Sequence, residues 1–250
     1  VHSRTVATAV DRDGRYVAVR SLESGKERRL PYDKLILATG ATPVVPPIEG
    51  RELQNVLTLH GVADAERMRA LLAGRAALDV VIIGGGLIGV EVTESLVRSG
   101  CRVTIVEALP QILSLLDEEM ATQVVAHMRS RGVKVLTDAR VTALKPAADA
   151  PGRVGSAETT AGTLPADMVV IAAGVRPNVG LARDCGLTIG ETGAIAVDDH
   201  LRTSDPDVFA IGDCAQSTNL VTGRPAYVPL GSTANKQGRV AAVNATGGDD

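Results

Sequence analysis

Aromatic residues and clusters of basic residues are scarce in this sequence. Its 250 residues include one Phe, three Tyr and no Trp, and the formal net charge is −3. Proteins that bind nucleic acid place clustered Lys and Arg side chains on the phosphates, and those that bind single strands stack bases on aromatic rings. The sequence therefore argues against nucleic acid as a partner.

Cysteines and long apolar runs are scarce as well. Cys101, Cys185 and Cys214 are too few and too scattered for a disulfide framework or a zinc site, and the four histidines show no metal-ligand or triad spacing. No apolar run approaches the roughly 18 residues of a membrane span, and no signal pattern opens the chain. We expect a cytoplasmic protein in a reducing compartment, without a metal site and without membrane contact.

Short apolar runs alternate with segments of helical spacing along most of the chain. Strands are predicted at residues 5–10, 15–22, 35–38, 79–83, 103–106, 133–136, 141–144, 153–160, 168–172, 194–197 and 208–211. Helices are predicted at 64–74, 87–99, 117–131 (with Asp117 as its cap) and 232–245, and the prolines between 41 and 50 predict a linker. This order predicts the α/β class, with a Rossmann-like, doubly wound parallel sheet and helices on both faces.

A glycine-rich loop follows the predicted strand at 79–83 and opens the predicted helix at 87–99. The segment Gly84-Gly85-Gly86-Leu87-Ile88-Gly89 matches GxGxxG in the strand–loop–helix context that this pattern requires. We assign Gly84 to a tight turn, Gly86 to close approach of a pyrophosphate, and Gly89 to helix–strand packing. The phosphates would meet free N–H groups at the helix N-terminus. The simpler alternative is a tight turn without a ligand.

An acidic residue stands where a dinucleotide site needs one. Glu107 ends the predicted strand at 103–106, 18 residues after Gly89, and a carboxylate there accepts hydrogen bonds from the adenosine ribose. It also repels a 2′-phosphate, because like charges about 4 Å apart cost on the order of 4 kcal/mol at an effective dielectric constant near 20. No Arg occurs between 108 and 128 to offset this, so NAD(H) is favoured over NADP(H). The alternative is a solvated strand end.

A second acid follows the glycine loop. Glu91 lies in the second turn of the predicted helix, within an otherwise apolar face. It could hydrogen-bond the nicotinamide end of a dinucleotide or the ribose there. It could equally be a helix N-terminal acid that the helix dipole stabilises by a few tenths of a kcal/mol. The sequence leaves both interpretations open.

One fourteen-residue phrase occurs twice. Residues 30–43 and 164–177 are identical at six positions and are separated by a constant 134 residues, which indicates two related supersecondary units. The glycine loop at Gly84 precedes the second copy by 80 residues, and equal spacing would place a first loop before Val1. We therefore expect a fragment that contains one complete nucleotide-binding domain and the rear part of another.

The chain resembles the FAD-dependent pyridine nucleotide–disulfide oxidoreductases. The resemblance covers nearly the whole chain and is carried by the phrases at 38–40, 84–91, 172–178 and 203–213. It implies that an NAD(H) domain at residues 49–177 is inserted into an FAD domain, of which residues 1–48 and 178–250 are parts.

The resemblance also implies roles for residues outside the glycine loop. It places Gly212 and Asp213 against the flavin ribitol, and an acid that follows a buried strand and a glycine also lies where α/β proteins bind ligands. A turn-forming Asp is the alternative. The family further assigns Thr39 and Gly40 to the flavin, the helix start at Thr233 and Ala234 to the flavin pyrimidine edge, and Gly174 to the nicotinamide side. For the helix, an ordinary amphipathic helix is the alternative.

The segment at 229–239 is most similar to the branch of coenzyme A disulfide reductases, NADH oxidases and NADH peroxidases. This implies hydride transfer from NADH to FAD and on to a cysteine disulfide, a coenzyme A disulfide, peroxide or oxygen, in a parent homodimer. The redox Cys of that branch would lie upstream of Val1, so no catalytic residue is assigned within the chain and turnover by the fragment is not expected. Two alternatives stay open: a ferredoxin- or rubredoxin-type reductase without a redox Cys, and a dinucleotide-binding module without catalysis.

Overall fold

The computed structural model describes residues 1–75 and 77–248. The chain forms two compact units. The inserted unit is Pro43–Gly174, and the flanking unit is made of Val1–Thr42 and Val175–Asp250. The assignment of one unit to NAD(H) and of the other to FAD stays a prediction.

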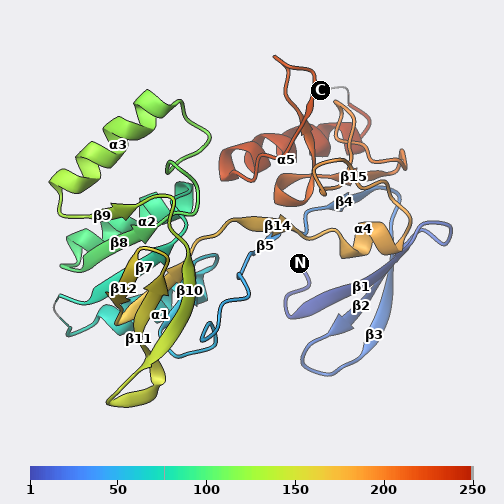
Figure 1. Cartoon of the computed structure of the whole chain (residues 1–250). Helices are drawn as coiled ribbons and strands as arrows, with labels where there is room; N and C mark the ends of the chain where they lie inside the picture. The colour runs from blue at the N-terminus through green and yellow to red at the C-terminus, as the bar shows by residue number, and fades with distance from the viewer. Residues whose placement is uncertain (76, 249–250) are drawn as a thin grey trace. The chain divides into compact units, whose positions relative to one another are not determined.

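A five-stranded sheet forms the centre of the inserted unit (Figure 1). Its order is β6 (Val56–Thr58), β13 (Met168–Ile171), β7 (Asp79–Ile83), β8 (Arg102–Val106) and β9 (Lys134–Leu136). Every pair in it is parallel. The strand order reverses between β7 and β13, which is the position where open α/β sheets bind ligands at the carboxyl ends of their strands.

The two faces of this sheet are covered differently. Val80 and Ile82 pack with residues of α1 (Val62–Leu72), α2 (Leu87–Arg98) and α3 (Glu118–Ser130). Val81 and Ile83 pack against the antiparallel strands β10 (Val141–Ala147), β11 (Ala150–Thr159) and β12 (Gly162–Pro165). The α/β class and the parallel sheet are confirmed, but the prediction of helices on both faces was wrong. A fully apolar strand shows only that both its faces are buried, and not what covers them.

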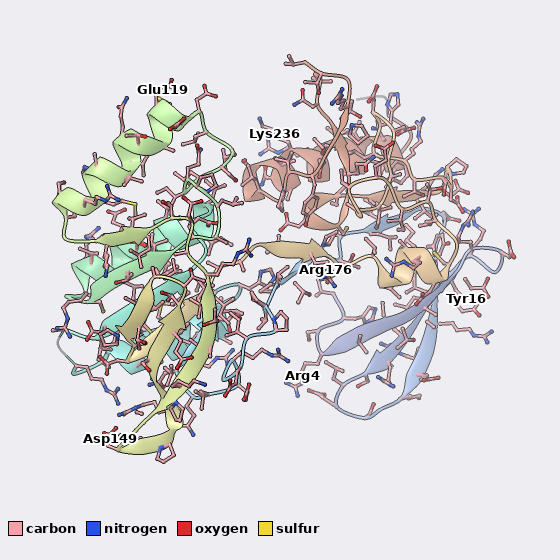
Figure 2. The ribbon with its side chains drawn as sticks, in the orientation of Figure 1. Arg4, Tyr16, Glu119, Asp149, Arg176 and Lys236 are labelled. Atoms are coloured by element: carbon pink, nitrogen blue, oxygen red, sulfur yellow. The ribbon has the colours of Figure 1, made fainter. Side chains whose placement is uncertain are left out.

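The flanking unit contains an antiparallel sheet and a parallel strand pair. The antiparallel sheet is β1 (Thr5–Asp11), β2 (Tyr16–Ser21) and β3 (Glu27–Pro31), and Figure 2 labels Tyr16 on it. The parallel pair is β4 (Leu35–Leu37) with β15 (Val208–Ala210). The remaining elements are α4 (Gly180–Asp184), the 3₁₀ turn Gly212–Cys214, the hairpin β16 (Ser217–Thr218) and β17 (Pro225–Ala226), and α5 (Gly231–Ala245).

Several predicted segments differ from the structure. The expected linker begins with a strand, β5 (Ala41–Pro43), which pairs with β14 (Val175–Pro177); a proline is tolerated at the end of so short a pair. The strand predicted at 194–197 is replaced by isolated bridges from Ile195 to Ile189 and Ala215. Asp117 is the N-cap of α3 but makes no side-chain cap hydrogen bond. No helix within the described part of the chain has the length and apolarity to cross a membrane.

Candidate functional site

The glycine loop connects β7 to α2 in a conformation that requires glycine at several positions. Gly84 has φ +108°, and a Cβ on it would collide with the carbonyl oxygen of Ala172. A Cβ on Gly89 would collide with the carbonyl oxygen of Gly84, and one on Gly85 would lie 2.5 Å from Cγ2 of Ile112. These three glycines are therefore demanded by the packing of the loop itself.

Gly86 differs from the other glycines of the loop. It is the N-cap of α2 with φ −74°, and no heavy atom lies within 4 Å of the position that a Cβ would take. The N–H of Val90 donates the first intrahelical bond, to Gly86 O at 3.0 Å. The N–H groups of Leu87, Ile88 and Gly89 therefore precede the hydrogen-bonded ladder of α2, where a helix favours an anion. Only an external group would benefit from the missing side chain at Gly86.

Glu107 follows β8 and lies beneath the glycine loop. Its Oε2 accepts a hydrogen bond from the Gly85 N–H at 2.6 Å, and its Oε1 accepts one from the Leu109 N–H at 2.8 Å. Two backbone donors therefore fix the half-buried carboxylate. Because each carboxylate oxygen can accept more than one hydrogen bond, capacity for a ribose hydroxyl remains.

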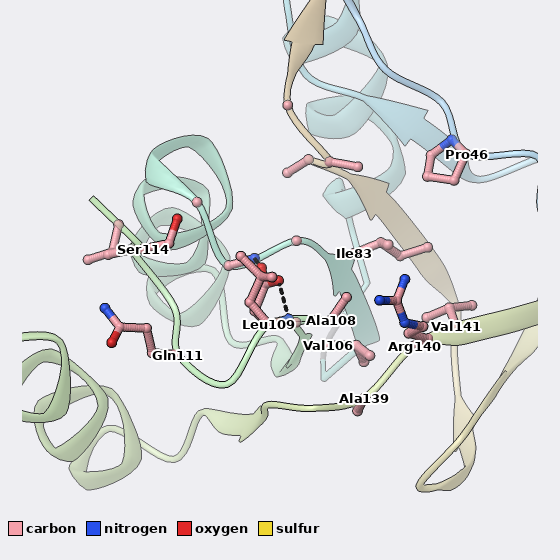
Figure 3. Close-up of a pocket in the computed structure, with 18 of the residues that line it drawn as sticks. Pro46, Ile83, Val106, Ala108, Leu109, Gln111, Ser114, Ala139, Arg140 and Val141 are labelled. Carbon is pink, nitrogen blue, oxygen red and sulfur yellow. Dashed lines mark hydrogen bonds between the residues drawn. The ribbon is translucent and has the colours of Figure 1, made fainter. Parts of the chain in front are cut away.

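A pocket of about 400 Å³ opens beside the loop and Glu107. Figure 3 shows it, with dashed lines for hydrogen bonds between the residues drawn. Its lining comes from the carboxyl ends of β7, β8 and β13 and from the segment before β10. Gly174, with φ +95°, lines it, and its carbonyl accepts the N–H of Val44 at 2.9 Å. This volume lies within the range of small-molecule sites.

The donor set fits one end of an adenine dinucleotide. A diphosphate carries the negative charge that the start of α2 favours, and the open space at Gly86 allows it to approach the backbone. A ribose offers the hydroxyl donors that the Glu107 carboxylate can accept. Within the described part of the chain, no group of His, Cys, Asp and Glu side chains could hold a metal ion.

Glu91 lies away from this pocket. Its side chain is exposed on α2, where it lines a separate hollow with Val97 and with Val124 of α3. Among the residues that the structure describes, it is not part of the lining of the first pocket. Its role at the nicotinamide end stays a prediction.

Sequence reasoning missed Arg140. No Arg lies between residues 108 and 128 to offset Glu107, but the structure places Arg140 in the lining of the same pocket (Figure 3). The segment at 138–140 runs beside the end of β8, because the N–H of Ala139 donates to Glu107 O at 3.0 Å. The order of strands in a parallel sheet could have suggested this, because residues that end β8 and β9 meet at one edge.

In the flanking unit, the carboxyl ends of β4 and β15 lie side by side. The N–H of Ile211 donates to Leu37 O at 3.0 Å. Beyond β4, Thr39 Oγ1 donates to Asn178 O at 2.6 Å, and Asn178 Nδ2 donates to Thr39 O at 3.0 Å. The Asn178 N–H also donates to Gly40 O at 2.9 Å. These bonds hold Thr39 and Gly40 at the end of the parallel pair.

The turn after β15 is held against the start of α5. Gly212 has φ +69°, its N–H donates to Gln237 Oε1 at 2.7 Å, and a Cβ on it would lie 3.4 Å from Cβ of Ala234. Tyr227 donates its hydroxyl to the backbone oxygen of Asp213 at 2.9 Å. Burial, with the Asp213 charge second, raises the pKa of Tyr227 to about 12. Asp213 and the first turn of α5, which includes Thr233, therefore belong to one local cluster.

None of the three cysteines has the surroundings of a nucleophile. Cys101 and Cys214 are buried, and the Cys214 thiol contacts Ile211 O at 3.2 Å. Burial raises the pKa of Cys101 and of the partly buried Cys185. Reactive cysteines have a lowered pKa and an accessible sulfur, so these thiols are better described as packing groups.

Comparison with known proteins gives consistent matches over nearly the whole chain. The family model "Pyridine nucleotide-disulphide oxidoreductase" matches residues 1–238. An "NAD(P)H sulfur oxidoreductase (CoA-dependent)" of Pyrococcus abyssi is 37% identical over 96% of this chain and 53% of the relative.

Solved structures agree with these matches. An NAD-dependent persulfide reductase from A. fulgidus is 43% identical, with a TM-score of 0.92 over 98% of this chain and 44% of that chain. A reductase in the covalent putidaredoxin reductase–putidaredoxin complex is 30% identical, with a TM-score of 0.88 over 98% of this chain and 58% of that chain. The chain spans about half the length of the curated relatives it matches.

Proposed function

Because this chain belongs to the pyridine nucleotide-disulphide oxidoreductase family, we propose that its inserted unit binds NAD(H) and that its flanking unit forms part of an FAD site. Residues 49–177 would hold the dinucleotide, and residues 1–48 and 178–250 would contact the flavin. The whole protein would be an NADH-dependent flavin oxidoreductase.

The arrangement of Gly86 and Glu107 is the observation that carries the NAD(H) proposal. Gly86 leaves open space where any other residue would place a Cβ, directly before the free N–H groups of α2. Glu107 is fixed by two backbone donors at the next strand end. The first feature suits a diphosphate and the second suits the adenosine ribose.

In this proposal the residues of the loop and Glu107 have different physical tasks. The N–H groups at Leu87, Ile88 and Gly89 bind and orient the diphosphate, and Glu107 fixes the ribose and disfavours a 2′-phosphate. FAD, when bound, supplies the chemistry that accepts a hydride from NADH and passes electrons onward. The start of α5, which lies against Gly212, would place a helix N-terminus beside that group.

The acceptor that we favour contains a sulfur–sulfur bond. Two of the relatives described above are a CoA-dependent sulfur oxidoreductase and a persulfide reductase, and the branch that the sequence resembles includes coenzyme A disulfide reductases. The redox Cys would then come from a part of the protein outside these 250 residues. A second candidate is electron transfer to a protein partner, which the likeness to putidaredoxin reductase favours.

Calorimetric titration of the 250-residue chain with NADH, NADPH and FAD tests the binding proposal. We expect saturable binding of NADH with a stoichiometry of one, and weaker binding of NADPH. Failure of a folded sample to bind NADH would refute the assignment of the glycine loop. For the whole protein, NADH-dependent reduction of polysulfide rather than of a ferredoxin would distinguish the two acceptor classes.

A further inference from the structure

Arg140 places a cationic group in the lining of the pocket that the glycine loop and Glu107 also line. These two are the charged residues in the lining of that pocket, within the described part of the chain. The Arg140 backbone is held at both ends, because its N–H donates to Thr160 Oγ1 at 3.0 Å and its carbonyl accepts the Thr160 N–H at 2.9 Å. The side chain therefore starts from a fixed point beside the end of β8.

Neither charge neutralises the other in the structure. The Glu107 carboxylate accepts its hydrogen bonds from the backbone of Gly85 and Leu109. None of the ion pairs found among the described residues includes Arg140. Its exposed guanidinium, drawn with its nitrogens in Figure 3, is thus available to a ligand.

We propose that Arg140 moderates the nucleotide selectivity set by Glu107, by offering a counter-charge that lets this pocket accept a 2′-phosphate as well. This inference rests on the proposed NAD(H) site and extends it. A guanidinium binds a phosphate monoester through paired N–H donors. A ribose that carries two free hydroxyls has no such charge to offer, so Arg140 contributes little to NADH.

The opposite charges of Glu107 and Arg140 predict a modest and salt-dependent preference for NADH over NADPH. Glu107 alone would disfavour a 2′-phosphate by close to three decades in affinity at short range. The attraction between Arg140 and the 2′-phosphate cancels part of this repulsion. Salt screens exposed charges more than partly buried ones. Because the Arg140 guanidinium is exposed and Glu107 is half-buried, added salt should weaken the attraction from Arg140 more than the repulsion from Glu107, so the preference for NADH should grow with ionic strength.

Two small ligands test the contribution of the 2′-phosphate by itself. Adenosine 2′,5′-bisphosphate and 5′-AMP differ only in the 2′-phosphate, so calorimetric titration of the 250-residue chain with each measures what that phosphate contributes. In Arg140→Gln we expect about tenfold weaker binding of the bisphosphate and less than about twofold change for 5′-AMP. Arg140→Lys, which keeps the charge but not the paired donors, should fall between Arg140→Gln and the unaltered chain.

The matched control is Arg131→Gln, which removes one exposed guanidinium that lines a different hollow, beside α3. It should leave both ligands unaffected, and the thermal unfolding of each variant should match that of the unaltered chain. Equal losses for both ligands in Arg140→Gln, or no loss for either, would overturn the inference. If 5′-AMP and NADH both fail to bind the unaltered chain, the proposed NAD(H) site itself fails, and this inference with it.

Discussion

At the residue scale, the glycine loop contains three glycines that its own packing requires and one, Gly86, that the packing does not require. Gly84, Gly85 and Gly89 are required because a Cβ would strike the chain itself, whereas the space at Gly86 is open. The GxGxxG pattern treats three of these positions alike, and it has no place for Gly85. The structure therefore assigns different consequences to substitutions that the pattern would rank as equal.

Gly86→Ala and Gly89→Ala form a matched pair of substitutions that test this distinction. Gly89→Ala forces a side chain against the Gly84 carbonyl and should lower the free energy of unfolding by about 1–3 kcal/mol, as overpacking does. Gly86→Ala should cost less than about 1 kcal/mol, because alanine is a poorer N-cap than glycine but restricts the unfolded chain at a φ of −74° that alanine can adopt. It should nevertheless weaken NADH binding at least about tenfold. Urea unfolding and NADH fluorescence titration measure the two effects. Equal losses of stability would contradict the assignment.

Glu107→Gln should affect both the loop and the ligand. An amide can accept one of the two N–H bonds from Gly85 and Leu109, but its NH₂ group then faces the other donor. Leaving that donor unsatisfied costs about 1–3 kcal/mol. We expect NADH affinity to fall by about tenfold or more, and NADPH affinity to fall less, because a repulsion is also removed.

Calorimetry with both nucleotides checks this prediction, with Glu94→Gln as the control. This variant removes the same charge from an exposed position on α2, where the Glu94 carboxylate lies 3.8 Å from Arg98 and both side chains are about three-quarters exposed. A parallel loss of NADH affinity in the control would show that the net charge, and not the position of Glu107, is responsible.

At the scale of elements, the sequence predicted the helices and strands that are marked by the pattern of their own residues. The strand at 79–83, the helices at 87–99 and 117–131, and the strand at 168–172 were predicted nearly at their observed bounds. β3 and β12 were missed, because each is a short edge strand whose pairing partner, rather than its own pattern, makes it a strand. The antiparallel cover of the central sheet was missed for a related reason, since it depends on which element packs there.

Local patterns in the sequence mark much of the candidate site, but no local pattern marks Arg140. The glycine loop and Glu107 are marked by a local pattern followed by a regular spacing. Arg140 has no motif, and its position in the pocket follows from β9 lying beside β8. Local signals thus identify the proposed phosphate and ribose positions, whereas the proposed role of Arg140 depends on the order of strands in the sheet.

The cap of α3 gives a prediction at this scale. Asp117 occupies the N-cap position without a side-chain cap bond, so its carboxylate contributes only through the helix dipole. Asp117→Ala should therefore lower the free energy of unfolding by a few tenths of a kcal/mol, and not by the roughly 1 kcal/mol that a bonded cap contributes. Chemical unfolding of the variant measures this, and a loss above about 1 kcal/mol would mean that a cap bond forms in solution.

At the scale of the whole molecule, the aromatic residues give the two units different spectroscopic properties. Tyr16, Tyr32, Tyr227 and Phe209 all belong to the flanking unit, and the inserted unit contains no aromatic residue. Tyrosine fluorescence therefore reports unfolding of the flanking unit alone. Bound NADH, in contrast, would report the inserted unit without interference from Trp.

This separation allows a pH prediction for the flanking unit. A hydrogen bond from Arg12 lowers the pKa of Asp205, and hydrogen bonds from Lys34 and Arg15 lower the pKa of Asp207. A lowered pKa in the folded state stabilises the fold above the ordinary Asp value of about 4, and that stability is lost as the pH falls from there through the folded value. Tyrosine-detected urea unfolding should show this loss as the pH is lowered below about 4.

Arg12→Gln tests the cause of this acid sensitivity. Arg12 bonds Asp205 at 2.7 Å and the carbonyl of Cys185 at 3.2 Å. The variant should be less stable by about 1–2 kcal/mol at neutral pH, and the difference from the unaltered chain should shrink on acidification. A difference that stays constant with pH would exclude the ion pair as its source.

The central claim is that the backbone at the start of α2 binds the diphosphate of an adenine dinucleotide while Glu107 holds its ribose. A crystal structure of this chain grown with NADH tests it most directly. The account predicts the diphosphate against the N–H groups that follow Gly86, and ribose hydroxyls within hydrogen-bonding distance of the Glu107 carboxylate. NADH bound elsewhere, or a pocket that stays empty at saturating NADH, would contradict it.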